Sequence, residues 1–111
     1  MVIVDITAQN DSSKIRIFNC YRPPGLSNRD CDSLDYIRTM CKCIDDSIRN
    51  ISKYVICGDF NFPSINWSHY NLLRSNDDSC SGIFLDFCYN NSLHQFNSRP
   101  TRLNNIVSIL L

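Results

Sequence analysis

The sequence contains no glutamate, so all eleven of its acidic residues are aspartates. It has no excess of either charge, because eleven lysines and arginines balance the aspartates and the formal net charge is zero. This balance excludes a global basic field, so any nucleic-acid binding must be local. No stretch approaches the roughly 20 apolar residues of a membrane-spanning helix, and residues 1–5 lack the features of a secretory signal. We therefore expect an intracellular protein, nuclear or cytoplasmic, without a membrane partner.

Paired cysteine spacings are also missing, although the sequence contains seven cysteines. An odd number without an export signal does not predict a disulfide framework. A zinc site needs two ligand pairs of the Cys-x-x-Cys kind, and only Cys41-Lys42-Cys43 comes near one. Cys20 and Cys57 lie in apolar, strand-like runs and Cys88 in a helix-like one, where a reduced cysteine acts as a small hydrophobic residue. We expect buried free thiols and no disulfide-linked partner.

What is present is the composition of one small globular domain. With 111 residues, of which 43% are hydrophobic, the chain can form one core at most, so we treat residues 1–111 as a single domain. The alternation over residues 2–6 and 15–21 is typical of strands. The polar cluster at residues 9–13 has the length of a turn between antiparallel neighbours, and the two strands are predicted to form a hairpin.

Two amphipathic stretches predict helices. From residue 32 to residue 53 the apolar side chains recur every three or four positions, and Asp32 or Ser33 can cap the first turn. The Asp45-Asp46 pair within this helix is interpreted as part of its solvated face rather than as a catalytic pair. A second, shorter helix is predicted over residues 79–90.

The remaining segments predict strands and loops. The continuous apolar run at residues 53–58 indicates a strand buried on both faces. Residues 62–78 are polar and contain a proline, so we expect a long surface loop with Trp67 as its anchor. Two further strands are predicted over residues 93–96 and 106–111, separated by a loop. This order of elements fits an α/β or α+β layer architecture.

Asp59 and Asn61 are the first candidates for chemistry. They follow the apolar run, and in an extended segment a two-residue spacing places both side chains on one face. Gly58 lets another backbone or a ligand come close. An aspartate there can accept a proton from water or bind a hard cation, and an amide can hydrogen-bond a phosphate. The alternative is a simple turn that ends the strand, since Asp and Asn serve turns well.

Three motifs occur in one order along the chain and carry a family resemblance. They are Tyr21-Arg22-Pro23-Pro24, then Gly58-Asp59-Phe60-Asn61-Phe62-Pro63, then Arg99-Pro100-Thr101-Arg102. With them the chain resembles the endonuclease domain of jockey-like LINE retrotransposons. That domain belongs to the endonuclease/exonuclease/phosphatase superfamily and is similar to apurinic endonucleases and deoxyribonuclease I.

The resemblance implies an α/β fold of the four-layered sandwich type, here incomplete at both termini, and magnesium-assisted cleavage of a DNA strand. It assigns catalytic roles to three residues. Asp59 resembles the aspartate that activates or orients the attacking water, and Asn61 its partner near the scissile phosphate. Tyr21 resembles the tyrosine that donates to that phosphate; without the motif, it would equally well be a half-buried aromatic residue at a strand end.

DNA is the partner that the resemblance implies. Arg22, Thr101 and Arg102 are expected to bind it, since an arginine can pair with phosphate and a threonine hydroxyl can donate to it. For Arg102 alone, a solvated surface charge would be the default interpretation. His69 and His94 have no partners at metal-ligand spacing and are not expected to hold a metal.

The sequence also departs from the family pattern. The family binds its magnesium chiefly through a glutamate, and this sequence has none. The family's Ser-Asp-His motif is absent as well, and Ser108 stands where the family has a supporting aspartate. We therefore expect a fragment, truncated at both ends, that binds magnesium poorly and is inactive by itself, because the remaining residues cannot replace a metal and a charged base.

Two other functions remain open at this point. The chain could be a non-catalytic remnant that binds nucleic acid or protein, or a superfamily phosphatase or phosphodiesterase. The Tyr-Arg-Pro-Pro and Pro-Thr-Arg sequences favour the retrotransposon branch over the phosphatases. A nicking assay with magnesium separates the endonuclease from the binding module.

Overall fold

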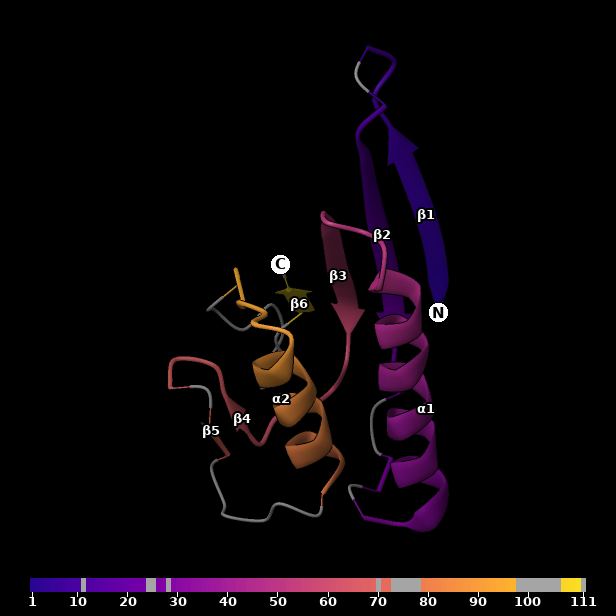
Figure 1. The fold of residues 1–111 in the computed structure, drawn as a ribbon. Coiled ribbons are helices and arrows are strands. Elements are labelled where there is room, and N and C mark those ends of the chain that lie inside the picture. The colour runs from indigo at the N-terminus through magenta and orange to yellow at the C-terminus, as the bar shows by residue number, and fades with distance from the viewer. Residues whose placement is uncertain are drawn as a thin grey trace.

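The computed structural model describes residues 1–10, 12–23, 26–27, 29–69, 71–72, 79–97 and 107–110, of which 71–72 and 107–110 are described by their backbone alone. Two helices and six strands form in these residues (Figure 1). In chain order they are β1 (Val2–Thr7), β2 (Lys14–Tyr21), α1 (Cys31–Ile48), β3 (Tyr54–Asp59), β4 (Ile65–Asn66), β5 (Asn71–Leu72), α2 (Cys80–Asn90) and β6 (Val107–Leu110).

The main sheet has the strand order β1-β2-β3-β6. β1 and β2 pair antiparallel, which confirms the predicted hairpin. β2 and β3 run parallel and are joined through α1, while β6 returns antiparallel to β3. The mixed sheet with its two helices confirms the α/β class. The predicted loop at residues 62–78 also contains the short antiparallel pair of β4 and β5.

Helix α1 forms where its periodicity predicted it but ends five residues early. The side chain of Asp30, one position before the helix, accepts a hydrogen bond from the Ser33 N–H at 2.8 Å and so caps the first turn. At the other end, the Ile51 N–H donates to the Ile48 carbonyl at 3.1 Å. The prediction to residue 53 was wrong because β3 runs opposite to α1, and the chain needs residues 49–53 to reverse its direction.

Helix α2 confirms the prediction for residues 79–90, with Ser79 as its cap. The predicted strand at residues 93–96 was wrong. Ser92 has a left-handed φ of 53°, and the Leu93 N–H donates back to the Cys88 carbonyl at 2.9 Å. This turn directs Leu93 into the core, where it is 3% exposed, instead of into a sheet.

The core lies between the two helices and one face of the main sheet. Phe84 of α2 is fully buried and sits at its centre. Its ring centroid lies 4.5 Å from that of Phe60 and 5.1 Å from that of Phe62. Trp67 contacts the same ring edge-on at 6.4 Å and is buried, which confirms its predicted role as the anchor of its loop. In the described part of the chain, no helix is long and apolar enough to cross a membrane.

The opposite face of the main sheet is apolar and only partly covered by described residues. Partners across a sheet share a face, and alternate residues along a strand do too. The registers of β1, β2 and β3 therefore place seven apolar side chains together on this face. They are Val2, Val4, Ile6, Ile15, Ile17, Val55 and Cys57, all exposed or half-buried. The prediction that residues 53–58 are buried on both faces holds only for the helix-covered face, which carries Ile56 and Gly58.

An ion pair ties the hairpin to α1. The Arg16 guanidinium donates to both carboxylate oxygens of Asp5, at 2.7 and 2.8 Å, and to the Ser47 carbonyl at 2.6 Å. The hydrogen bond from Arg16 lowers the pKa of the Asp5 carboxyl from its ordinary 3.8 to about 2. Asp5 therefore stays ionised in the folded chain at pH values where an ordinary aspartate is already protonated.

The seven cysteines are all free thiols in this structure. Cys20, Cys41, Cys80 and Cys88 are buried, whereas Cys31 and Cys43 are exposed. Burial raises the pKa of Cys20 to about 11 and that of Cys41 to about 12. Since the thiolate is the reactive form, these groups are doubly protected from electrophiles.

We predict that native alkylation with iodoacetamide at neutral pH modifies Cys31 and Cys43 and leaves the four buried cysteines unmodified until the chain is unfolded. Peptide mass spectrometry before and after addition of urea measures the difference. A control reaction on the unfolded chain should label all seven cysteines. Rapid native labelling of Cys41 or Cys88 would contradict the packing of the core.

Candidate functional site

Tyr21 and Asp59 lie side by side at the carboxyl ends of two parallel strands. They are register partners at the last position of β2 and β3. Register partners share a face of the sheet, so the two side chains point in the same direction. Tyr21 is 58% exposed and Asp59 is half-buried. The fold thus brings together two residues that are 38 positions apart in the sequence. They lie at the edge where ligands generally bind to α/β sheets.

Gly58 is required for this pairing. Its φ of 145° lies outside the range that residues with a side chain adopt readily, and an added Cβ would lie 1.8 Å from the Cys20 carbonyl oxygen. The glycine therefore permits close approach of another backbone, as expected, and that backbone belongs to β2. Asp59 owes its position to this contact.

Asn61 does not continue the extended strand. β3 ends at Asp59, and Asn61 adopts a left-handed φ of 51°. The expectation that Asp59 and Asn61 share one face of an extended segment was therefore wrong. Asn61 is buried, and its side-chain amide donates to the Arg22 carbonyl.

Arg22 is buried, with 3% of its surface exposed. Its Nη1 donates to the Asn61 carbonyl and its Nη2 to the Ser27 carbonyl, each at 3.1 Å. The guanidinium also lies 4.6 Å from the centroid of the Phe62 ring. A guanidinium enclosed in this way does not reach a DNA phosphate, so the geometry argues against the DNA contact that the resemblance implied for Arg22.

The backbone of Tyr21 is held from the helix side. The Tyr36 hydroxyl of α1 donates to the Tyr21 carbonyl at 2.9 Å. On the other side, the Arg22 N–H donates to the Asp59 carbonyl at 2.8 Å and extends the parallel pairing by one residue. Sequence reasoning missed Tyr36 as a supporting residue, because nothing in the helix pattern marks it apart from other exposed positions.

The C-terminal motif lies partly outside the described residues. Thr101 and Arg102, both predicted to bind DNA, are not among them. β6, which follows this motif, pairs with β3 so that Ser108 is opposite Gly58 and Val107 opposite Asp59. The backbone at the position where the family has a supporting aspartate thus runs directly beside the candidate site.

The described residues do not fit a magnesium ion. Among them, no group of three or more histidine, cysteine, aspartate or glutamate side chains lies close enough to hold a metal. Asp59 supplies one carboxylate at the candidate site, and the Asn61 amide nitrogen is engaged with the Arg22 carbonyl. Magnesium prefers several oxygen ligands in a nearly octahedral arrangement. We therefore derive no step that passes through a metal.

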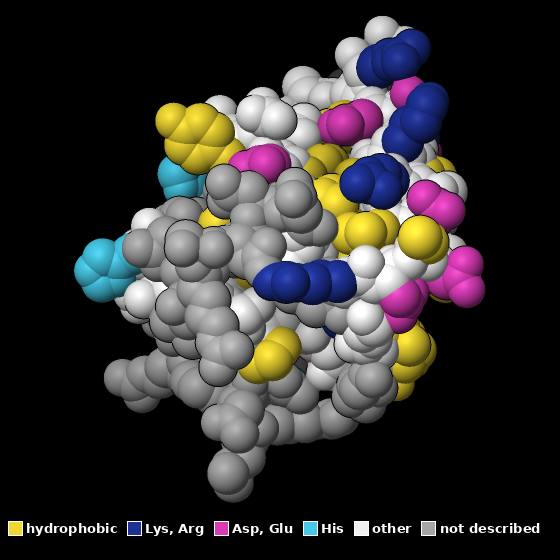
Figure 2. Space-filling view, turned by 90° about the horizontal axis from the view of Figure 1, so that it is seen from below, with side chains coloured by type: hydrophobic (Ala, Val, Ile, Leu, Met, Phe, Trp, Pro, Cys, Tyr) yellow, Lys and Arg dark blue, Asp and Glu magenta, His cyan; other side chains and the backbone are white. Residues whose placement is uncertain are grey.

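The described part of the face at the strand ends carries charges of both signs. Figure 2 views the molecule from below, toward the carboxyl ends of β2 and β3, and basic and acidic side chains are both present among the described residues. This agrees with the zero net charge. Binding of a polyanion here would depend on a few local contacts rather than on long-range attraction.

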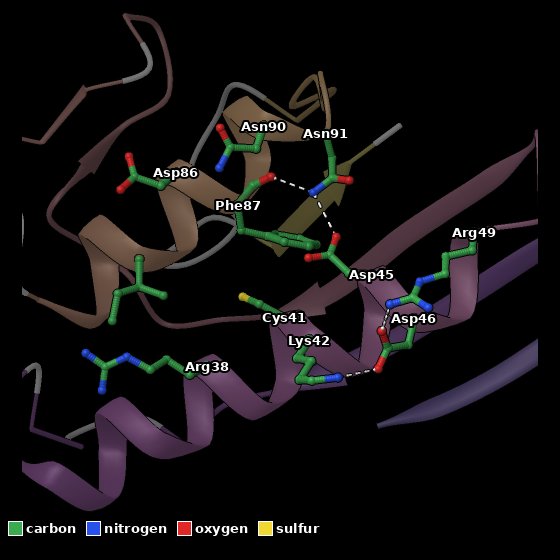
Figure 3. Close-up of a pocket in the computed structure, with 11 residues that line it drawn as sticks. Arg38, Cys41, Lys42, Asp45, Asp46, Arg49, Asp86, Phe87, Asn90 and Asn91 are labelled. Atoms are coloured by element: carbon green, nitrogen blue, oxygen red, sulfur yellow. Dashed lines mark hydrogen bonds and ion pairs between the residues drawn. The ribbon is translucent and has the colours of Figure 1, made fainter.

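A separate hollow of about 490 Å³ lies between α1 and α2 (Figure 3). Asp45 accepts a hydrogen bond from the Asn91 amide at 3.1 Å across it. Asp46 pairs with Lys42 at 2.7 Å and with Arg49 at 2.8 Å. Both aspartates are exposed and form part of a solvated helix face, as the sequence indicated. The residues that line the hollow include none of the candidate catalytic residues.

A family model described as endonuclease-reverse transcriptase matches residues 15–109 of the chain. No curated protein and no solved structure matches it significantly. The matched range contains Tyr21, Asp59 and Asn61 and covers the elements from β2 into β6.

Proposed function

The chain belongs to the endonuclease-reverse transcriptase family, and from this premise we propose that it is a piece of a DNA endonuclease domain that nicks target DNA for a jockey-like LINE retrotransposon. Membership makes it an endonuclease/exonuclease/phosphatase-type domain of a retroelement. The observation that carries the proposal is the pairing of Tyr21 with Asp59 at the carboxyl edge of the parallel strands. A DNA target would place its site of action in the nucleus.

The two side chains suit two tasks in phosphodiester cleavage, which are stabilising the phosphate charge and activating the attacking water. The exposed Tyr21 phenol can donate a hydrogen bond to a non-bridging phosphate oxygen, where negative charge grows in the transition state. The Asp59 carboxylate can accept a proton from the attacking water or orient it. Neighbouring strands lie about 4.8 Å apart, so one phosphate can lie within reach of both side chains.

We propose that the chain by itself binds DNA but does not cleave it. The resemblance implies that magnesium stabilises the charge of the transition state, and the described residues offer no cluster of metal ligands. No glutamate exists anywhere in the sequence to complete one. Without the metal, Tyr21 and Asp59 lack the many powers of ten in rate that metal-assisted phosphodiester cleavage requires. The same observation favours the second candidate function, a non-catalytic nucleic-acid binding module.

The open apolar face of the main sheet supports the four-layered sandwich that the resemblance implies. A sheet face formed by Val4, Ile17, Val55 and their neighbours is stable in water only when another layer covers it. We propose that this sheet is one of the two sheets of a four-layered sandwich, with the second sheet on the face opposite α1 and α2.

We predict that the purified chain, incubated with supercoiled plasmid and magnesium, gives no nicking above that of an Asp59→Ala control. Fluorescence anisotropy with a labelled DNA duplex should show weak binding that is lost as the salt concentration rises. Nicking that disappears in Asp59→Ala would overturn the proposed inactivity. Absence of both nicking and salt-sensitive binding would overturn the assignment to DNA.

A further inference from the structure

Arg22 and Asn61 join the ends of β2 and β3 through reciprocal hydrogen bonds. The Arg22 side chain donates through Nη1 to the Asn61 carbonyl at 3.1 Å, and the Asn61 amide donates to the Arg22 carbonyl. The Arg22 N–H donates to the Asp59 carbonyl at 2.8 Å. We call these three hydrogen bonds the Arg22–Asn61 latch.

The latch is anchored on the side away from the strands. Arg22 Nη2 donates to the Ser27 carbonyl at 3.1 Å, and the guanidinium lies 4.6 Å from the Phe62 ring centroid. Arginine has a planar guanidinium, which can donate in two directions and stack its flat face on a ring. Lysine offers a single compact ammonium group and can satisfy at most part of this set.

The burial of the charge indicates that these contacts have a specific use. Removing a guanidinium from water costs free energy that must be offset by hydrogen bonds and ring contacts, and Arg22 is 3% exposed. An arginine that serves to bind DNA would keep its charge accessible. The Arg22 guanidinium instead donates to the Asn61 carbonyl, while the backbone N–H of the same residue donates to the Asp59 carbonyl.

Resting on the proposed nuclease function, we propose that Arg22 is the positioning residue of the candidate site: it does not contact DNA, and the latch fixes Tyr21 and Asp59 in one orientation. Its neighbours in sequence and space explain how. Tyr21 directly precedes Arg22 and is the register partner of Asp59. Without the latch, Asp59 and Asn61 would lose their hydrogen bonds to Arg22. The left-handed turn at Asn61 would then lose its support.

The test is hydrogen exchange of individual groups, followed by nuclear magnetic resonance, in the whole chain and in Arg22→Lys. We expect exchange of the backbone N–H of residue 22, which donates to the Asp59 carbonyl, and of the Asn61 side-chain amide, which donates to the carbonyl of residue 22, to accelerate about ten- to a hundredfold. The reason is that loss of the guanidinium hydrogen bond to the Asn61 carbonyl loosens the turn at Asn61. Arg29→Lys, at an exposed position nearby, is the matched control and should leave these rates unchanged. A uniform acceleration that includes core amides such as that of Phe84 would mean a contribution to global stability alone and would overturn the proposal.

A second variant keeps the test decisive if Arg22→Lys does not fold. Phe62→Leu removes the ring beside the guanidinium and leaves the hydrogen-bonding groups in place, so the same amides should exchange faster by a smaller factor. Unchanged exchange of the Arg22 backbone N–H and the Asn61 side-chain amide in Phe62→Leu would then overturn the latch.

Addition of a short DNA duplex separates the latch from the proposed function. In the unsubstituted chain the duplex should shift the Tyr21 and Asp59 signals, and in Arg22→Lys these shifts should shrink several-fold. If the duplex shifts neither signal in the unsubstituted chain, the assignment to DNA fails while the exchange rates still decide the latch. If the duplex shifts both signals equally in both chains, the positioning role is wrong and the proposed function stands.

Discussion

Replacement of Phe84 by alanine is expected to lower the free energy of unfolding by about 3–5 kcal/mol. Phe84 is fully buried, and its ring contacts those of Phe60, Phe62, Phe87 and Trp67 at centroid distances from 4.5 to 6.4 Å. Truncation leaves a cavity among rigid rings that cannot close around it. Because domains of this size have total stabilities of about 5–15 kcal/mol, the variant should lose a large part of its stability. Urea denaturation followed by tryptophan fluorescence measures the loss, since Trp67 belongs to the cluster.

The matched control is Tyr89→Ala on the same helix. Tyr89 is 82% exposed, so its truncation should change stability by no more than about 0.5 kcal/mol. A loss of less than about 1 kcal/mol in Phe84→Ala would mean that the aromatic cluster is not the centre of the core. Phe60 and Phe62 flank Asn61 in the sequence. The aromatic cluster therefore also supports the loop that follows Asp59.

Gly58→Ala is expected to destabilise the chain by at least about 3 kcal/mol, through backbone strain together with overpacking. A methyl group at this position would lie 1.8 Å from the Cys20 carbonyl oxygen, and the φ of 145° is unfavourable for alanine. The strands must separate to relieve the clash. Because Asp59 is the next residue, the variant should also lose the side-by-side placement of Tyr21 and Asp59.

Thermal and urea unfolding of Gly58→Ala, compared with Asn19→Ala, checks this prediction. Asn19 is exposed on β2, where it is the register partner of Cys57, and its replacement should have an effect within about 0.5 kcal/mol. Equal stabilities for the two variants would show that β2 and β3 do not approach as closely as the structure has them.

The sequence predicted those elements whose signal is local. The alternation in β1 and β2 with a polar turn between them predicted the hairpin, and the three-and-four spacing predicted α1 and α2. The end of α1 and the segment after α2 were predicted wrongly. A strand was predicted over residues 93–96, but the left-handed turn at Ser92 directs Leu93 into the core and leaves Phe96 exposed.

In the candidate site, too, some features could be predicted from the sequence and others depend on the tertiary structure. Gly58, Asp59 and Tyr21 could be selected from motifs, because their chemistry and their order along the chain are written in the sequence. The role of Arg22 could not be read in this way, since an arginine after a strand is equally compatible with a DNA contact and with a buried latch. Only the tertiary structure distinguishes these two roles, because it places the Asn61 and Ser27 carbonyls beside the guanidinium.

By itself, the sequence determined the α/β class, the positions of the two helices, and the family to which the Gly58-Asp59-Phe60-Asn61 motif belongs. The tertiary structure alone decided that Tyr21 and Asp59 are neighbours, that Asn61 turns away from the strand, and that Arg22 is enclosed. The physical reason is the range of the interactions. Propensity and periodicity act over a few residues, whereas parallel pairing and the contacts of Arg22 with Asn61 and Phe62 depend on groups that lie 38 or more positions apart along this chain.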